Sequence, residues 1–183
     1  HNKNILCEKP LFSSKNFELE EMKNTEKRNL SSIYIAYNHR FEPSIIKLHD
    51  LIKNKEKNLG EIYSCKIFYG NGTSQLVKKS DWKDSDTGVL GDLICHNLDI
   101  LNYIFEDFDY IPDSTFLKNN ETKAPDFVST MGNGTIKENK NFFVNLEATY
   151  LSWKNFFSID IIGSKGSVHL KSLCKWSSSS LEI

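Results

Sequence analysis

The chain has 183 residues, 39% hydrophobic and 12% aromatic, which is enough apolar content for one substantial core or two small ones and excludes a chain disordered by composition. Lys and Arg total 23 against 24 Asp and Glu, so the net charge of -1 gives no electrostatic attraction to nucleic acid or to an anionic membrane. Without an apolar run of roughly 18 to 20 residues, or a signal-peptide pattern at the N-terminus, we expect a cytoplasmic protein that binds neither.

The first 40 residues predict a strand, a helix and a second strand. The chain opens on His-Asn-Lys-Asn, without an initiator Met, and runs directly into the apolar strand at 5–7, so we expect a fragment of a longer protein. A helix is predicted over 15–29, with Ser13 and Ser14 as candidate N-caps. Residues 32–37 are rich in β-branched and aromatic side chains and predict the second strand. This order is typical of the end of a Rossmann-type α/β domain.

The next segment predicts two helices around one strand. Pro43 suits the first turn of a helix whose Lys-rich end stops at Gly60. Residues 61–69 alternate like a strand, residues 70–87 predict a polar loop, and residues 89–104 predict a further helix. The apolar stripe of the helix that starts at Pro43 consists of Ile45, Ile46, Leu48 and Ile52.

Beyond Pro112 the pattern predicts an antiparallel sheet. The turn sequences Asn133-Gly134 and Ser164-Lys165-Gly166 separate apolar runs, and the serines at 177–180 predict a loop. The predicted strands cover 127–131, 142–151, 156–162 and 167–170. We therefore expect an α+β fold, in which residues 41–183 form an open, predominantly antiparallel sheet packed on helices. Residues 1–40 would be the tail end of a Rossmann-type α/β domain.

The four cysteines predict no special chemistry. Cys7, Cys65, Cys95 and Cys174 lie far apart and form no C-x-x-C pair. We expect reduced thiols in a cytosolic protein, without a structural zinc site or a redox couple.

The helix over 89–104 carries the most informative polar pattern. At about 100° per residue, Asp92, His96 and Asp99 fall within about 60° of one another. A carboxylate near a histidine can fix its tautomer and raise its basicity, as a general base requires. Two alternatives exist, namely the solvated face of an amphipathic helix and a metal site whose other ligands are unaccounted for. The core side of this helix would consist of Leu93, Ile94, Leu98, Ile100, Leu101 and Ile104.

Lys9 is a second candidate functional residue. A residue before proline favours an extended conformation, and Lys9 follows the carboxyl end of the first predicted strand. Ligands of open α/β sheets bind at that edge. The alternative is a surface lysine beside a turn proline.

Several motifs occur in an order that points to a known family. Residues 5–11 read Ile-Leu-Cys-Glu-Lys-Pro-Leu, and residues 37–43 read Tyr-Asn-His-Arg-Phe-Glu-Pro. Leu-Gly-Glu-Ile at 59–62, the D-x-x-x-H-x-x-D run at 92–99 and Ile-Gly-Ser-Lys-Gly-Ser at 162–167 follow. Together these motifs, over about residues 1–170, resemble the family of glucose-fructose oxidoreductase, inositol dehydrogenase and MocA.

The resemblance implies an NAD(P)-dependent oxidoreductase that oxidises a secondary alcohol of a sugar, polyol or nucleotide sugar. His96 would take the hydroxyl proton, Lys9 would hold the oxygen, and Asp92 would tune Lys9 or His96 through a short hydrogen bond. The residues that the resemblance implies are Lys9, Asp92 and His96 for catalysis, Asp99, Arg40 and Asn38 for the substrate, and Glu8, Lys9 and Pro10 for the cofactor. We expect Lys9, Asp92 and His96 to converge near the carboxyl edge of the parallel sheet formed by the first two strands.

One part of such an enzyme is not found in this sequence. A G-x-G-x-x-G phosphate turn is absent, because Gly-Asn-Gly at 70–72 neither follows the first strand of a βαβ unit nor opens a helix. We therefore expect the fragment alone to be inactive, with its main NAD or NADP site outside it.

A non-catalytic module for oligomerisation or binding through the open sheet is the alternative. The alternation of Phe142, Val144, Leu146, Phe157, Ile159 and Ile161 with residues that are not all polar predicts a second apolar sheet face. A homodimer or homotetramer would form through that face.

Overall fold

The computed structural model describes residues 4–10, 24, 32–53, 59–136 and 140–183. The helix predicted over 15–29 lies outside the described residues except for Asn24, which is helical, and so do residues 54–58. Among the described residues the helical segments are η1 (Asn38–Phe41), α2 (Pro43–Lys53), α3 (Ser74–Val77), η2 (Leu90–Ile94) and α4 (Cys95–Phe105). The strands are β1 (Ile5–Cys7), β2 (Ile33–Ile35), β3 (Ile62–Gly72), β4 (Asp109–Lys118), β5 (Phe127–Ile136), β6 (Lys140–Thr149), β7 (Leu151–Gly163), β8 (Gly166–Lys171) and β9 (Ser180–Glu182).

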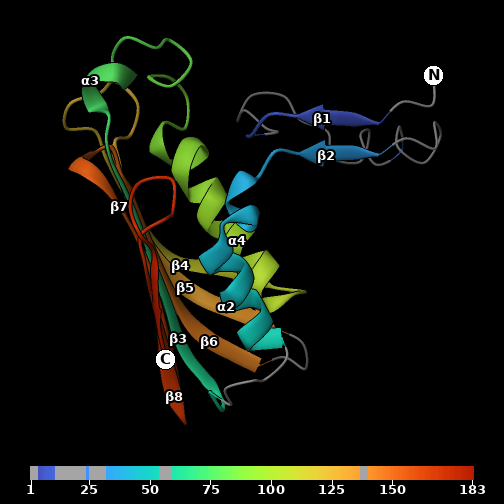
Figure 1. The fold of residues 1–183 in the computed structure, drawn as a ribbon. Helices are drawn as coiled ribbons and strands as arrows, with labels where there is room; N and C mark the ends of the chain where they lie inside the picture. Colours follow the sequence, from blue (N-terminus) through green and yellow to red (C-terminus); the bar gives the residue numbers. More distant parts are fainter. Residues whose placement is uncertain (1–3, 11–23, 25–31, 54–58, 137–139) are drawn as a thin grey trace.

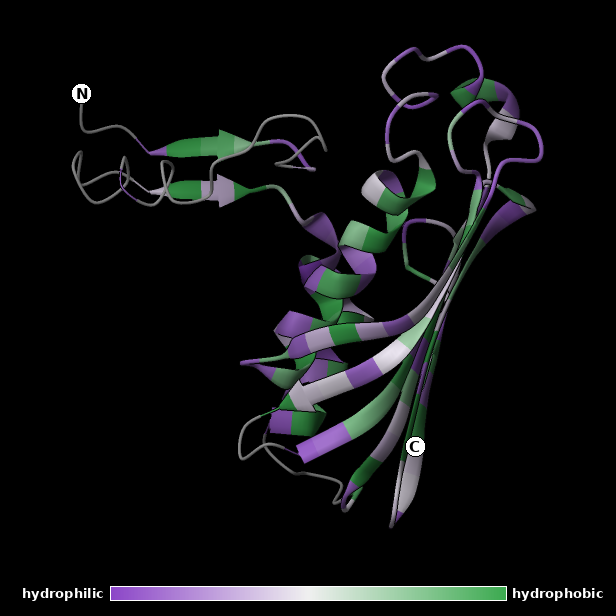
Figure 2. Ribbon diagram, turned by 180° about the vertical axis from the view of Figure 1, so that it is seen from behind, coloured by the Kyte–Doolittle hydropathy of each residue, from purple (hydrophilic) through white to green (hydrophobic). Residues whose placement is uncertain are grey.

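Strands β1 and β2 form a small parallel sheet of their own, beside the larger sheet and its helices (Figure 1). Both strands were predicted, and the pairing aligns Ile5 with Ile33. Their side chains are apolar along most of their length (Figure 2), yet Leu6 is 76% and Tyr34 59% exposed. Parallel strands are normally covered on both faces, whereas this pair leaves these side chains exposed.

The second sheet has seven strands in the order β4-β5-β6-β3-β7-β8-β9. Only β3 and β6 are parallel neighbours, and every other neighbouring pair is antiparallel. The predicted open, predominantly antiparallel sheet is therefore confirmed. The two-residue turn at Ser164 and Lys165, which joins β7 to β8, is confirmed as well.

Helices α2 and α4 cover one face of this sheet (Figure 1). The inward side chains of the central strands, such as Ile67, Leu146 and Ile159, are fully buried, as are Leu48 of α2 and Leu101 of α4. Burying a side chain of this size contributes roughly 1.5 to 3 kcal/mol, so this layer holds the helix that carries the candidate site. Within the described ranges, no helix has both the length and the apolar character needed to cross a membrane.

The turn predicted at Asn133-Gly134 is wrong. Both residues lie inside β5 and pair with Phe143 and Phe142 of β6. A Cβ on Gly134 would lie 2.7 Å from the ring of Phe108, so this glycine makes room for an aromatic side chain. The dipeptide Asn-Gly looks the same in a sequence whether its glycine makes room for a neighbouring side chain or forms a turn.

Other boundaries also differ from the predictions. Strand β4 was missed because it contains Pro112, which is tolerated here on an edge strand next to a bulge. The run at 142–151 divides at Tyr150 into β6 and β7. In the predicted loop at 70–87, β3 extends to Gly72 and α3 follows, and the predicted loop at 177–180 contains the first residue of β9.

The predicted stripe of α2 needs one correction. Ile46 is 37% exposed, whereas Leu51, which was not assigned to the stripe, is 1% exposed. The six alternating residues from Phe142 to Ile161 face the helices and form the core.

Candidate active site

The site lies where the predicted helix over 89–104 begins. The helix begins with a π-helical turn, η2, which is followed by α4. The prediction of one uninterrupted α-helix was therefore wrong. Gly88 precedes this turn with φ +51°, and a Cβ there would lie 2.3 Å from the backbone oxygen of Pro125. Only glycine tolerates that combination. The backbone N–H of Val89 donates to the same oxygen at 2.9 Å, which anchors the turn to the loop before β5.

Asp92 is the central acid of the site. The ammonium group of Lys9 contacts Asp92 Oδ1 and donates to the Asp92 backbone oxygen at 2.6 Å. Lys83 Nζ and the Tyr150 hydroxyl each donate to Asp92 Oδ2 at 3.1 Å. Burial alone would raise the pKa of Asp92, but Lys9 and Lys83 outweigh it and hold that pKa below its usual value. The carboxylate is therefore ionised at neutral pH.

His96 lies one turn further along the helix and is 5% exposed. Burial, and next the charge of Lys9, lower the pKa of His96 to about 3, so the ring is neutral at physiological pH. Its Nδ1 is buried without a hydrogen-bond partner among the described residues. The ring of His39 stacks on it with centroids 4.1 Å apart, and Tyr37 meets it edge-on at 5.9 Å.

Asp99 forms a bidentate pair with Arg40. Arg40 Nε donates to Asp99 Oδ2 at 2.8 Å, and a second guanidinium nitrogen contacts Oδ1. Burial raises the pKa of Asp99 against the opposing effect of Arg40. The fork of Arg40 suits this planar geometry, so the pair is a fixed ionic feature on the same side of the helix as His96.

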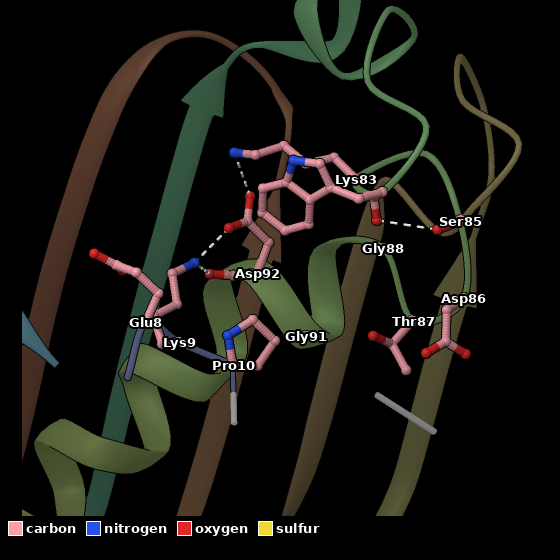
Figure 3. A pocket seen from close by; sticks show the side chains of 11 residues that line it. Glu8, Lys9, Pro10, Lys83, Ser85, Asp86, Thr87, Gly88, Gly91 and Asp92 are labelled. Atoms are coloured by element: carbon pink, nitrogen blue, oxygen red, sulfur yellow. Dashed lines mark hydrogen bonds and ion pairs between the residues drawn. The ribbon is translucent and has the colours of Figure 1, made fainter. Parts of the chain in front are cut away.

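A pocket of about 490 Å³ opens beside Asp92 (Figure 3). One wall is the turn of Glu8, Lys9 and Pro10, and the other consists of residues between Trp82 and Asp92. Figure 3 shows the Asp92 carboxylate between Lys9 and Lys83. A pocket of this size with a few converging polar groups is typical of a small-molecule site.

The structure places the predicted site residues as follows. Asp92 contacts Lys9 and not His96. Lys9 lies just beyond the carboxyl end of β1. Glu8 and Pro10 line the pocket, and Arg40 and Asp99 pair with each other. The Asn38 side chain is exposed, and its oxygen accepts a hydrogen bond from His39.

The alternative that the polar stripe is merely a solvated helix face is wrong. Asp92, His96 and Asp99 are only 6%, 5% and 7% exposed. Among the described residues, there is also no group of three or more His, Cys, Asp or Glu side chains that could hold a metal ion.

Sequence reasoning missed four neighbours of the site: His39, Tyr69, Lys83 and Tyr150. His39 could have been chosen, because it stands between the two selected residues Asn38 and Arg40. Lys83 and the tyrosines give no local signal. Lys83 reaches Asp92 from the loop nine residues before it, and Tyr69 and Tyr150 come from segments distant in sequence.

A nicotinamide cofactor fits this chain only in part. The pocket beside Lys9 can take one end of such a molecule, and Glu8, Lys9 and Pro10 would contact it there. Gly70 and Gly72 lie in β3, where a Cβ on Gly72 would lie 2.5 Å from the Trp153 backbone. These glycines therefore serve the close approach of two strands and do not form a phosphate turn.

Several known proteins are similar to this chain in sequence or in fold. Glucose-6-phosphate 3-dehydrogenase of Bacillus subtilis (strain 168) is 34% identical over 176 residues, which cover 91% of this chain and 45% of that protein. Levoglucosan dehydrogenase in complex with NADH and L-sorbose has a TM-score of 0.73 at 22% identity, covering 92% of this chain and 47% of that one. An NAD binding oxidoreductase from Klebsiella pneumoniae has a TM-score of 0.76 at 16% identity, covering 97% and 50%.

The chain thus spans about half the length of these relatives. The solved structures, at under 25% identity, share its fold. A family model for the GFO/IDH/MocA C-terminal domain matches residues 45–169, which is more than half of the chain. The chain therefore belongs to the GFO/IDH/MocA family.

Proposed function

We propose that the complete protein is an NAD(P)-dependent dehydrogenase that oxidises a secondary alcohol of a sugar, polyol or nucleotide sugar. This chain supplies the substrate-binding and catalytic part. The observation that carries the proposal is the meeting of Lys9 and Asp92 at a pocket, one helical turn from a buried, neutral His96. The activities named for the relatives, glucose-6-phosphate 3-dehydrogenase and levoglucosan dehydrogenase, support the same reaction class.

His96 acts as the general base in this proposal. The ring is neutral above a pKa of about 3, so it keeps a lone pair for the hydroxyl proton, although the same low pKa makes it a weaker base than an imidazole that titrates near neutral pH. Because Nδ1 is buried, Nε2 is the nitrogen that a substrate hydroxyl can reach. A bound nicotinamide would supply the hydride acceptor, and the hydroxyl proton would pass to this nitrogen, so that a ketone is formed.

Lys9 holds the substrate oxygen, and Asp92 holds Lys9. Two of the three ammonium protons of Lys9 are directed to the carboxylate and backbone oxygens of Asp92, which leaves one for the reacting oxygen. Arg40, Asn38 and Asp99 contact other hydroxyl groups of the substrate. Glu8 and Pro10 accompany Lys9 at the cofactor.

The proposal divides the chain into two parts. Residues 1–40 are the remnant of the dinucleotide-binding domain, and residues 41–183 form the substrate-binding, catalytic and oligomerisation domain. The exposed apolar side chains of β1 and β2 support this division, because further strands of the complete domain would cover them. We place the protein in the cytoplasm, in keeping with four free cysteines.

The reaction class is tested with the complete protein and each nicotinamide cofactor. Incubation with separate sugars, polyols and nucleotide sugars is expected to produce reduced nicotinamide with at least one of them, at a rate measured by its absorbance. The matched control is the same compound without the oxidised hydroxyl group. If no compound reacts and the protein still forms oligomers, the non-catalytic binding module is the better interpretation.

The outer face of the large sheet is the proposed subunit interface. It exposes Phe116 at 57%, Met131 at 40%, Phe143 at 46% and Phe156 at 43%, on strands β4, β5, β6 and β7 respectively. Large exposed apolar side chains that gather on one face are typical of association sites. A homodimer, or a homotetramer built from such dimers, would cover them.

Phe143→Lys is expected to raise the dissociation constant of the dimer by about tenfold or more, because it places a charge in a desolvated interface. Sedimentation measures this change over a range of protein concentrations. Phe41→Lys is the control, since Phe41 is 77% exposed but lies in η1 on the helical side. A strict monomer at high concentration in the unmodified protein contradicts the interface.

A further inference from the structure

The imidazole of His96 lacks the partner that usually orients a catalytic histidine. Such a ring is commonly held by a carboxylate or backbone oxygen at its second nitrogen. Here the Asp92 carboxylate is occupied by Lys9, Lys83 and Tyr150, and the described residues give His96 Nδ1 no hydrogen bond. Packing against neighbouring rings is then the interaction by which the described residues can orient His96.

His39 is the residue packed most closely on that ring. Its imidazole lies 4.1 Å from that of His96, centroid to centroid, with only 9° between the two planes. Tyr37 and Tyr69 approach His96 at 5.9 and 6.2 Å, but at steep or tilted angles. His39 alone covers a whole face of His96 among the aromatic contacts that the described residues provide.

The position of His39 is itself fixed by two hydrogen bonds. Its Nδ1 lies 2.7 Å from Asn38 Oδ1, and its Nε2 lies 3.0 Å from the Tyr69 hydroxyl. Because an amide oxygen only accepts, Nδ1 carries the proton and Nε2 accepts from Tyr69. Tyr69 in turn packs edge-on against Phe157 at 5.5 Å in the core.

His39 stays neutral in this position. The residue is 2% exposed, and burial, followed by the nearby His96, lowers its pKa to about 2. A neutral ring can stack on His96 both before and after His96 takes a proton. Two imidazolium rings at this distance would repel each other.

We propose that His39 is a positioning residue, which holds the His96 ring face-on in its working orientation and shields it from water. The proposal rests on the proposed function, in which His96 is the base. Asn38 and Tyr69 set the tautomer and orientation of His39. This assigns Asn38 a role through His39 in addition to any contact with the substrate.

Two variants in the complete protein separate stacking from hydrogen bonding. His39→Gln keeps hydrogen-bonding groups but removes the ring. It is expected to lower kcat by about 10- to 100-fold with little change in KM, because a misplaced base slows the chemical step and not binding. His39→Phe restores a ring without hydrogen bonds, and it is expected to recover part of the lost kcat.

The titration of His96 is the second readout, and it does not depend on activity. NMR of protein with isotope-labelled histidine follows His96, whose signal is identified by its loss in His96→Gln. The midpoint is expected to rise from a pKa of about 3 toward the ordinary value of 6.5 in His39→Gln, because the exposed ring is better hydrated. In His39→Phe it is expected to stay low.

His49→Gln is the matched control. His49 also stacks on an aromatic ring, that of Tyr103 at 4.4 Å and 17°, but it lies outside the site. It should change neither kcat nor the titration of His96. An unchanged titration and kcat in His39→Gln overturn the proposal, as do equal losses in His39→Gln and His39→Phe. If the unmodified protein oxidises no substrate, the proposed function fails, and the titration still decides whether His39 controls His96.

Discussion

His96→Ala in the complete protein is expected to lower turnover by about 10²- to 10⁴-fold, with cofactor binding little changed. The imidazole is a neutral, buried base one helical turn from Asp92, and alanine leaves the substrate proton without this acceptor. Steady-state rates and cofactor titration measure the two effects separately. Near-normal turnover would remove His96 from the mechanism.

The control for this variant is His169→Ala. His169 lies in β8, with Asp160 2.6 Å from its Nδ1, so it tests the loss of a hydrogen-bonded histidine outside the site. The pH dependence gives a further check on the His96 assignment. The pKa of His96 is about 3, so His96 should not cause an inflection near pH 6.5 in kcat/KM of the unmodified protein. If such an inflection is present and is lost in His96→Ala, this pKa is wrong.

Local patterns in the sequence were sufficient for much of the fold. Strand Ile5–Cys7, strand Ile33–Ile35 and the helix that starts at Pro43 each carry their signal within a few residues, and the structure contains all three. Features set by contacts between distant segments were not predictable in this way. The parallel pairing of β3 with β6 and the packing of Phe108 over Gly134 are of this second kind.

In the candidate site, too, local patterns were predictable and contacts between distant segments were not. Helical spacing placed Asp92, His96 and Asp99 together, but spacing alone favoured a solvated face, and the burial of all three depends on the sheet beneath them. The meeting of Lys9 and Asp92, 83 residues apart, was expected only from the family resemblance. Tyr150 reaches Asp92 because β6 ends there, and nothing in its neighbouring residues indicates that contact.

Lys9→Met is expected to lower kcat by about 10²- to 10³-fold, the range found when one preorganised donor to a reacting oxygen is removed. Methionine is similar in length and apolar, so it removes the ammonium group with little change in volume. Among the described residues, the variant leaves the buried Asp92 carboxylate with Lys83 and Tyr150 as side-chain partners, so the pKa of Asp92 is expected to rise.

Lys83→Met is the matched comparison, because Lys83 contacts the other oxygen of the same carboxylate. Its side chain is 35% exposed against 15% for Lys9, so solvent screens its charge more strongly and its loss should cost about tenfold in kcat or less. Rates, cofactor affinity and thermal unfolding are measured for both variants. Equal losses of kcat would mean that Lys9 serves only to neutralise Asp92. A much larger loss for Lys9→Met, at similar cofactor affinity and stability, is the result expected if its ammonium group touches the reacting oxygen.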